Sequence, residues 1–329
     1  MIKAFSISIF LQIITLTLSG QNQERIYEDN NKKIIYHLTQ GRINGNYISY
    51  YKNGNKKAEG NFENNLRIGK WTVWDTLGNI RMERVYSDPF TFERIVPKVP
   101  DDKPIQLLNI PRYKIKYNKN GYITYAYIKE SDVHYLRRIW RYISPKENPI
   151  LFEKNLLFRL LNKHVLDSTI KAYSTKDDEF REPFMPKIDT TTAKVIGFKI
   201  KEDFFFDMNR IISDTRIMGI CPVIINKETK DTIDAYWVYH PQAREHLAQI
   251  NIESDSIPEK IKTLDDLFFY RYFYGRIIKQ STIYDRYLKD YLTGEKLLKE
   301  AERIELYLIE QEHNIWINLT KSIFINQQH

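Results

Sequence analysis

The sequence contains one cysteine, Cys221, among 329 residues. A single cysteine excludes an internal disulfide, and its place between Ile220 and Pro222 in an apolar run predicts an inert core thiol. The common catalytic signatures are missing as well: the chain has no G-x-S-x-G, no P-loop, no G-x-G-x-x-G and no C-x-x-C. These absences argue against the familiar classes of hydrolase, nucleotide-binding enzyme and dithiol oxidoreductase.

Long apolar runs are missing except at the start of the chain. Lys3 precedes an apolar stretch at 4–18, and small residues then lead to a cleavage position before Gln21. This pattern is typical of a secretory signal peptide at 1–20; a buried N-terminal strand is the alternative. The stretch is shorter than the about 20 apolar residues of a transmembrane helix, and no cysteine follows it to carry a lipid. We therefore expect an exported chain without an anchor of its own.

The chain is basic, with a formal net charge of +8 at pH 7. A basic surface can meet nucleic acid, anionic lipid or acidic cell-wall polymer. The lysines and arginines are spread along the chain without a concentrated block, which favours an ordinary solvated surface. We expect no nucleic-acid partner, and only indirect association with a membrane.

An internal repeat occupies the N-terminal part of the chain. Residues 45–54 and 69–78 match, and each begins and ends with glycine. Each unit predicts a strand, a glycine-containing turn and a second strand, so that successive hairpins stack into an array. The aromatic residues expected to stack between hairpins are Tyr47, Tyr51, Trp71 and Trp74. The pattern resembles the MORN repeat in its YwqK-like variant, which implies protein docking or contact with lipid head groups; a β-extension that only stiffens the N-terminus is the alternative.

Dense prolines separate this array from the rest of the chain. They are Pro89, Pro97, Pro100, Pro104 and Pro111. Prolines at this spacing prevent a helix or a central strand. We predict a MORN-like segment at 21–90, a linker at 91–112, an α+β domain at 113–320 and a tail at 321–329.

The predicted domain combines a small antiparallel sheet with helices. Alternating or β-branched runs at 195–201, 216–225 and 233–239 predict strands. Helices are expected at 133–143 after the capping residue Asp132, at 156–165, at 241–248, at 264–280 after a capping box at Thr263 and Asp266, and at 295–316. The fold class is therefore α+β: an N-terminal hairpin repeat array, followed by an α+β domain with a small antiparallel sheet and flanking helices.

Four blocks stand out in this domain. They read D-V-H-Y-L-R-R-I-W-R-Y-I at 132–143, I-K-E-D-F-F-F-D at 200–207, D-T-R-I-M-G-I-C-P-V at 214–223 and Y-W-V-Y-H-P-Q-A-R at 236–244. In this order, with further matches beyond them, they resemble the GldN family of gliding-motility proteins, called PorN in porphyromonads. The resemblance covers residues 113–320.

This resemblance implies a structural, non-enzymatic component of the type IX secretion system. It implies a periplasmic location at the outer membrane, in a homo-oligomeric ring with a lipoprotein of the GldK or PorK type. The periplasmic part of a GldM- or PorM-like motor is a further implied partner, and no cofactor is expected. The alternative is a peripheral binding module in which the repeat array contacts membrane or cell-wall anions.

Carboxylates gather at the end of the first predicted strand. Glu202, Asp203 and Asp207 are suited to acid/base work or to metal binding, but side chains along a strand diverge. Salt bridges to Arg210 or Arg216 are the favoured interpretation.

The histidines offer no clearer site. His164 lies on the apolar face of a helix, where a half-buried core histidine is favoured over a metal ligand. The gap between His240 and His246 fits no common zinc spacing. No catalytic, cofactor-binding or metal residue is predicted, although a periplasmic hydrolase using Asp203, Asp207 and His240 is the enzymatic alternative.

The aromatic residues at 268–274 are too many for one buried helix face, and exposed aromatic clusters mark interfaces. The candidate partner-interface residues are Phe269, Tyr272, Tyr274, Trp140 and Asp203. For Trp140, a core position is favoured over an interface.

Overall fold

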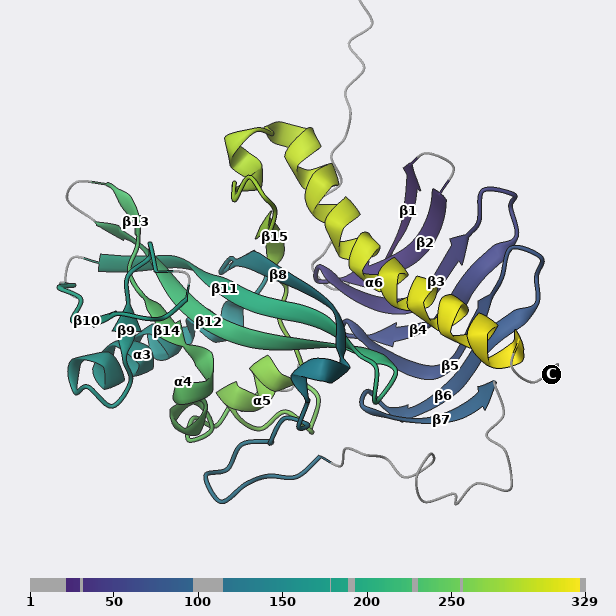
Figure 1. Cartoon of the computed structure of the whole chain (residues 1–329). Helices are drawn as coiled ribbons and strands as arrows, with labels where there is room; N and C mark the ends of the chain where they lie inside the picture. The colour runs from purple at the N-terminus through teal and green to yellow at the C-terminus, as the bar shows by residue number, and fades with distance from the viewer. Residues whose placement is uncertain are drawn as a thin grey trace, which may run out of the picture.

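Two antiparallel sheets and one long helix, with a few short helices, make up the protein (Figure 1). The computed structural model describes residues 22–29, 32–96, 115–177, 179–188, 193–226, 230–254 and 257–325, apart from the side chains of 226 and 320–325. The signal peptide predicted at 1–20 lies outside the described residues, as does most of the predicted linker. The predicted α+β fold class, a hairpin array followed by an α+β domain, is confirmed.

The first sheet is a meander in which each strand pairs with the next. Its strands are β1 (Gln23–Asp29), β2 (Lys32–Thr39), β3 (Arg42–Tyr50), β4 (Lys56–Glu63), β5 (Leu66–Trp74), β6 (Ile80–Asp88) and β7 (Thr91–Val96). Tyr47 and Trp71 occupy equivalent places on β3 and β5, are fully buried, and have ring centroids 5.8 Å apart. Gly54 and Gly78 have φ angles of 85° and 88°, which glycine adopts without strain in the turns. The predicted stacking is confirmed for Tyr47 and Trp71, whereas Tyr51 contacts Trp74 through a hydrogen bond from its hydroxyl to the Trp74 backbone oxygen at 2.6 Å.

Strand β7 corrects the start of the predicted linker. Residues 91–96 pair with β6, and the Asp88 carboxylate accepts hydrogen bonds from the backbone of Phe90 and Thr91 at 2.8 and 3.0 Å. Pro89 therefore lies in a hairpin turn, where no strand partner needs its missing N–H.

The second sheet has the strand order β10-β9-β14-β12-β11-β8-β15, with β13 paired to β12. Its strands are β8 (Val133–Ile143), β9 (Ala172–Tyr173), β10 (Pro183–Phe184), β11 (Ala193–Asp207), β12 (Ile212–Asn226), β13 (Thr232–Asp234), β14 (Trp237–Tyr239) and β15 (Arg276–Gln280). The helices are α2 (Pro149–Phe152), α3 (Leu156–Leu166), α4 (His240–Leu247), α5 (Leu264–Phe269) and α6 (Gly294–Ile325), with short 3₁₀ turns at η1 (Glu130–Asp132), η2 (Glu153–Asn155) and η3 (Leu288–Asp290). The helices predicted at 156–165, 241–248 and 295–316 are thus confirmed.

The helix predicted at 133–143 is wrong, because these residues form strand β8 between β11 and β15. Ile139 packs with residues of α6, whereas its neighbour Trp140 packs with Cys221 and Trp237. Successive side chains of a strand point to opposite faces of the sheet, so these two neighbours pack into different cores. Pairing with distant strands outweighed the local capping signal at Asp132.

The helix predicted at 264–280 is also wrong beyond its first turns. The capping box of Thr263 and Asp266 is present, but α5 ends at Phe269 and Arg271 has a φ of 52°. The chain then reaches β15. Because the segment is not one helix, its aromatic residues face several directions, and Phe268, Phe269, Tyr270 and Phe273 are all buried in the core.

Replacing Trp140 by alanine should lower the free energy of unfolding by about 3–5 kcal/mol, the usual cost of truncating a buried aromatic residue. Trp140 is 3% exposed, and the ammonium groups of Lys201 and Lys279 lie 5.8 and 4.3 Å from its ring centroid. Denaturant unfolding measures the effect. Leu136→Ala on the same strand is the control, since Leu136 is 56% exposed and should cost little. Equal stability of the two variants would contradict a core role for Trp140.

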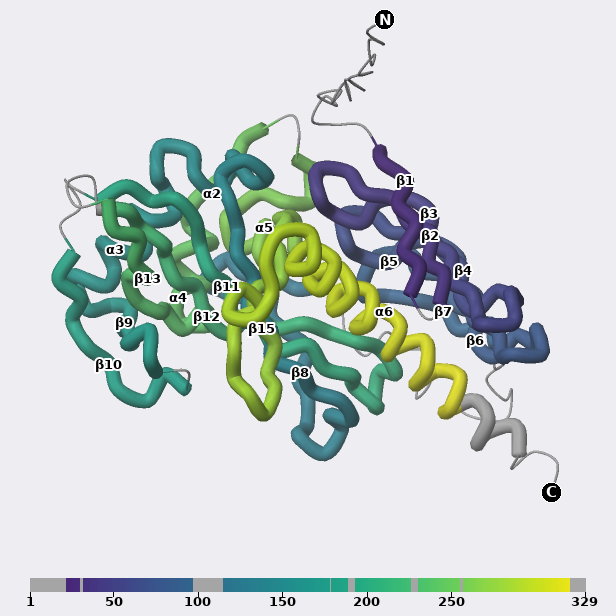
Figure 2. The backbone as a smooth tube through the Cα atoms, turned by 90° about the horizontal axis from the view of Figure 1, so that it is seen from above, coloured from purple at the N-terminus to yellow at the C-terminus, as the bar shows by residue number. Residues whose placement is uncertain are grey.

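Helix α6 joins the two sheets. Its side chains Leu306 and Trp316 belong to the buried core of the array, while Ile304 and Leu308 pack on the second sheet. Seen from above, α6 runs from beside β15 across the array (Figure 2). Helix α6 therefore completes the core of both the array and the second sheet.

Candidate functional site

A cavity of about 440 Å³ lies where the array, the second sheet and α6 meet. Phe62 and Tyr86 line it from the array, Phe204 and Ile277 from the second sheet, and Leu306 from α6. Its volume is within the usual range of small-molecule sites, which often lie between structural units. The cavity and the polar groups at its wall are therefore the candidate site.

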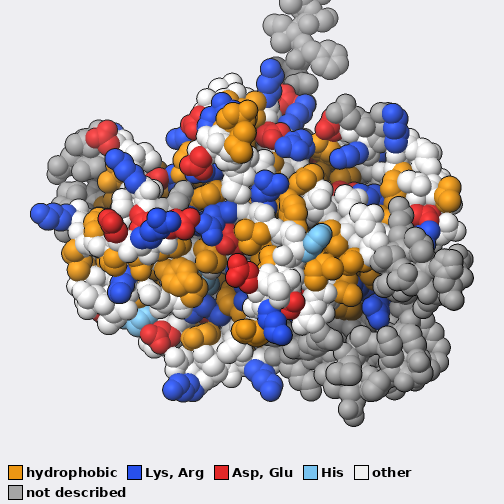
Figure 3. All heavy atoms as spheres, in the orientation of Figure 1, with side chains coloured by type: hydrophobic (Ala, Val, Ile, Leu, Met, Phe, Trp, Pro, Cys, Tyr) orange, Lys and Arg blue, Asp and Glu red, His pale blue; other side chains and the backbone are white. Residues whose placement is uncertain are grey.

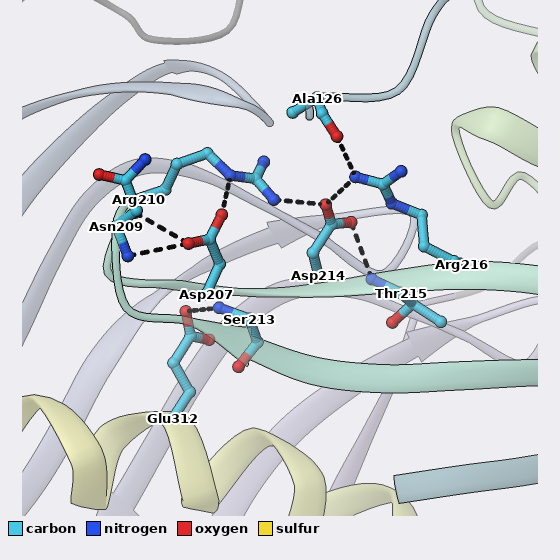
Figure 4. Close-up of polar contacts among 9 residues, drawn as sticks. All are labelled: Ala126, Asp207, Asn209, Arg210, Ser213, Asp214, Thr215, Arg216 and Glu312. Atoms are coloured by element: carbon cyan, nitrogen blue, oxygen red, sulfur yellow. Dashed lines mark hydrogen bonds and ion pairs between the residues drawn. The ribbon is translucent and has the colours of Figure 1, made fainter. Parts of the chain in front are cut away.

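The turn between β11 and β12 carries a chain of ion pairs at the cavity wall (Figure 4). Arg210 donates from Nε to Asp207 at 2.6 Å and from its terminal nitrogen to Asp214 at 2.7 Å. Arg216 donates to Asp214 at 3.3 Å. Burial raises the pKa of Asp214, but the charges of Arg216 and Arg210 outweigh burial and lower it. The salt bridge predicted between Asp207 and Arg210 is confirmed.

Glu312 of α6 connects this turn to the array. Its Oε1 accepts a hydrogen bond from the backbone N–H of Ser213 at 2.9 Å (Figure 4). Its Oε2 lies 2.6 Å from a terminal nitrogen of Arg67 on β5. One buried carboxylate thus holds three parts of the chain together at the edge of the cavity.

A second buried polar group fastens α6 to the array. Tyr47 donates to Oε1 of Glu310 at 2.8 Å, Nδ1 of His313 lies 3.1 Å from the same oxygen, and Lys57 pairs with Oε2. Burial raises the pKa of Glu310, but His313 and Lys57 outweigh it and lower that pKa strongly. The sequence analysis missed this group; its only local signal is a glutamate and a histidine three residues apart on the helix.

Glu202 lies between two arginines from other elements. Arg141 of β8 and Arg271, which follows α5, both pair with its carboxylate, and Arg141 also reaches Glu305 of α6. Burial raises the pKa of Glu202, but the two arginines outweigh it and lower the pKa to about 2. The predicted partners Arg210 and Arg216 are wrong for Glu202.

Asp203 has its own arginine as well. Nε and a terminal nitrogen of Arg138 donate to its two oxygens at 2.7 and 3.0 Å, a bidentate geometry. Arg138 lies across the strand pair from it, so the predicted pairing with Arg210 or Arg216 is wrong here too. Asp203, Asp207 and His240 therefore engage different groups and present no shared reacting centre.

The candidate interface residues near α5 face the array. Phe269 is buried at 6% exposure. The guanidinium of Arg42 lies 4.1 Å from the ring centroid of Tyr272, and a Cβ on Gly41 would lie 2.6 Å from the ring of Tyr274. These two tyrosines thus contact the turn between β2 and β3. Their contact with another protein stays a prediction.

His240 is a buried histidine at the start of α4. It is completely buried, and its ring packs edge-on to Phe268 at 5.8 Å between centroids. Burial, and then the charge of Arg244, lower the pKa of His240 to about 3. A neutral imidazole in this place acts as a core side chain.

This burial predicts a loss of stability in acid. The unfolded chain takes up a proton at His240 below the ordinary pKa of 6.5, whereas the folded chain resists it down to about 3. His240 alone should therefore remove about 3 kcal/mol of stability between pH 6.5 and 4. Urea unfolding across this pH range measures the slope. His240→Phe should flatten it; an unchanged slope would mean that other groups cause the acid sensitivity.

Metal-binding and membrane-spanning features were also sought. In the part of the chain that the structure describes, no group of three or more His, Cys, Asp or Glu residues is placed to hold a metal ion. His164 is half-buried, as predicted, and stacks on His246 with 3.9 Å between ring centroids. No described helix is long and apolar enough to cross a membrane.

Comparison with known protein families identifies a match. The family model described as gliding motility associated protein GldN matches residues 128–317, which is more than half of the chain. The matched stretch begins just before β8 and ends within α6, so it includes the whole second sheet and none of the array. No curated protein matches the chain.

Proposed function

This chain belongs to the GldN family of gliding motility associated proteins, and we propose that it is a non-enzymatic structural subunit of the type IX secretion and gliding-motility apparatus. The family match is the observation that carries this proposal. The internal pairing of Glu202, Asp203 and Asp207 with arginines supports it further, because carboxylates held in this way stiffen a scaffold and are not poised for proton transfer. Burial raises the pKa of Cys221, which fits an inert thiol.

The proposed place of action is the periplasmic side of the outer membrane. The leader-like stretch at 1–20 supports export. In this proposal the chain forms a homo-oligomeric ring with an outer-membrane lipoprotein of the GldK or PorK type. The ring in turn contacts the periplasmic part of a GldM- or PorM-like motor protein.

Cross-linking in intact cells tests this assembly. The expected result is a covalent adduct with an outer-membrane lipoprotein, and release of the uncross-linked chain from membranes by a salt or urea wash. Arg138→Gln is the control variant. It breaks the structural ion pair between Arg138 and Asp203, and the adduct should still form. Retention in the membrane after every wash, with the leader still attached, would contradict the proposal.

A second candidate function rests on the outer surface of the array. Leu77 lies in the turn between β5 and β6 and is 81% exposed. Ile80 and Val85 of β6 are also exposed. Such side chains suit contact with a membrane surface. Basic and acidic side chains are interspersed on the face of the molecule shown in Figure 3. Binding of the whole chain to anionic vesicles that weakens with salt and is lost in Leu77→Asp would support it.

A further inference from the structure

The cavity between the array and the second sheet is lined by many apolar side chains and has an open end. Phe62, Leu306, Leu308 and Ile277 line it and are each at most 3% exposed. Leu298 of α6 also lines it but is 48% exposed, so the cavity reaches solvent beside the first turns of α6. An apolar interior with one solvent-facing end suits a ligand that has an apolar body and a polar head.

The carboxylates that line the cavity are already occupied. Asp214 pairs with two arginines, and Glu312 binds Ser213 and Arg67. Glu302 accepts a hydrogen bond from the hydroxyl of Tyr36, and Glu305 pairs with Arg141. Three of the four carboxylates are thus next to arginines, whereas Glu302 keeps its negative charge beside a neutral hydroxyl.

Two of the lining arginines remain available. Within the described residues, Arg25 of β1 and Arg276 of β15 take part in no hydrogen bond or ion pair with a carboxylate. Arg25 is exposed and Arg276 is half-buried. Both arginines line the cavity together with Glu302 and Glu305. Because Glu305 pairs with Arg141, these two arginines face the single carboxylate of Glu302, which leaves an excess of positive charge.

The interior also offers two unused polar atoms. Oγ of Ser213 and Nε of Arg67 are shielded from solvent and have no hydrogen-bond partner. Both residues line the cavity. A buried polar atom without a partner is rare in proteins and marks a place where a bound molecule can supply one.

We propose that this cavity binds a small amphiphilic anion, with its acidic head at Arg25 and Arg276 and its apolar chain between α6 and the two sheets. The ligand class is a single-chain carboxylate or phosphate amphiphile, taken either as a free acid or from a lipid head group and its acyl chain. This site goes beyond the proposed structural role, because it lies on residues from both the array and the GldN-like part of the chain.

A fluorescent fatty acid tests the site. The probe is 11-(dansylamino)undecanoic acid, and its methyl ester is the uncharged counterpart. The acid should bind the whole protein saturably, one per chain, and about tenfold or more tighter than the ester, as expected for a charge-assisted contact. The double variant Arg25→Gln/Arg276→Gln should lose this preference and keep the affinity for the ester. Arg159→Gln is the control, because Arg159 is exposed on α3 and does not line the cavity.

Two further variants separate site filling from unfolding. Ala301→Leu adds bulk inside the cavity and should displace both probes, with a thermal melt to show that the fold is retained. Leu298→Asp places a negative charge at the exposed end and should weaken binding of the acid alone. If Ala301→Leu fails to fold, the effect of Leu298→Asp on binding of the acid still tests the proposal.

Vesicles distinguish the two sources of the ligand. Binding of anionic vesicles that depends on Arg25 and Arg276 would identify a lipid head group, and binding of the monomeric acid without vesicle binding would identify a free acid. The proposal is overturned by an absence of saturable binding in a folded protein. It is equally overturned by equal affinities for acid and ester, or by an unchanged acid affinity in the double arginine variant.

Discussion

Glu202→Gln should lower the free energy of unfolding by about 3–5 kcal/mol, the usual cost of removing one partner from a buried ion pair. The Glu202 side chain is 0% exposed, and those of Arg141 and Arg271 are 8% and 18% exposed. Glutamine fills the same space but leaves two largely buried guanidinium groups without their shared counter-charge. Urea unfolding at neutral pH, with an unchanged dependence on urea concentration, measures the loss.

The pH dependence of stability provides an independent check on Glu202. Its folded pKa of about 2 lies below the ordinary 4.5, so its contribution is fully present above pH 4.5 and is lost as pH falls toward 2. The Glu202→Gln variant should lack this part of the fall in stability between pH 4.5 and 2.

Glu305→Gln is the matched control for Glu202. Glu305 pairs with the same Arg141, but its side chain is 37% exposed and solvent screens the pair. Glu305→Gln should lower the free energy of unfolding by about 1 kcal/mol or less. Equal losses in Glu202→Gln and Glu305→Gln would show that burial of the Glu202 carboxylate does not determine how much its ion pairs stabilise the fold.

Local sequence signals predicted the parts of the fold that local chemistry decides. The glycines of the repeat fix hairpin turns at Gly54 and Gly78, and the capping box at Thr263 starts a helix where expected. The Asp207–Arg210 salt bridge was foreseen because its partners are only three residues apart at one turn. In each case the residues that determine the feature lie within a few positions of each other in the sequence.

Distant pairing explains what the sequence could not predict. Residues 133–143 have an acidic residue before them and mixed apolar and basic character, which also suits a helix; only the pairing with β11 and β15 makes them a strand. Arg141 and Arg271 lie 61 and 69 residues from Glu202. Such partners leave no local spacing to detect, so the ion pairs of Glu202 could be seen only in three dimensions.

The polar residues of α6 show a second limit. In the structure α6 has a core on each side, and Glu310, Glu312 and His313 are buried on the side of the array. Charged residues in a helix normally indicate a solvent-facing surface, and only the basic residues of the facing strands reveal otherwise.

Trp316→Ala should be the most damaging truncation on α6, with an expected loss of about 3–5 kcal/mol. Trp316 is 0% exposed and packs with Val73 and Met82 of the array and with Phe206 of the second sheet. Its indole N–H donates to the backbone oxygen of Ile211 at 3.0 Å. Alanine would remove this contact and open a space at the junction of both sheets.

The loss should spread to both sheets, because Trp316 also covers a buried charge. Arg84 of β6 is 0% exposed, and its guanidinium lies 4.5 Å from the ring centroid of Trp316. In Trp316→Ala, the backbone amides of β5, β6 and the β11–β12 turn should therefore all exchange hydrogen faster than in the unchanged protein. The variant should still unfold in one transition. Leu298→Ala, exposed on the same helix, is the control and should leave exchange unchanged. Faster exchange confined to α6, with the array still protected, would instead show that the array is stable without the helix and that the two parts of the chain are separable.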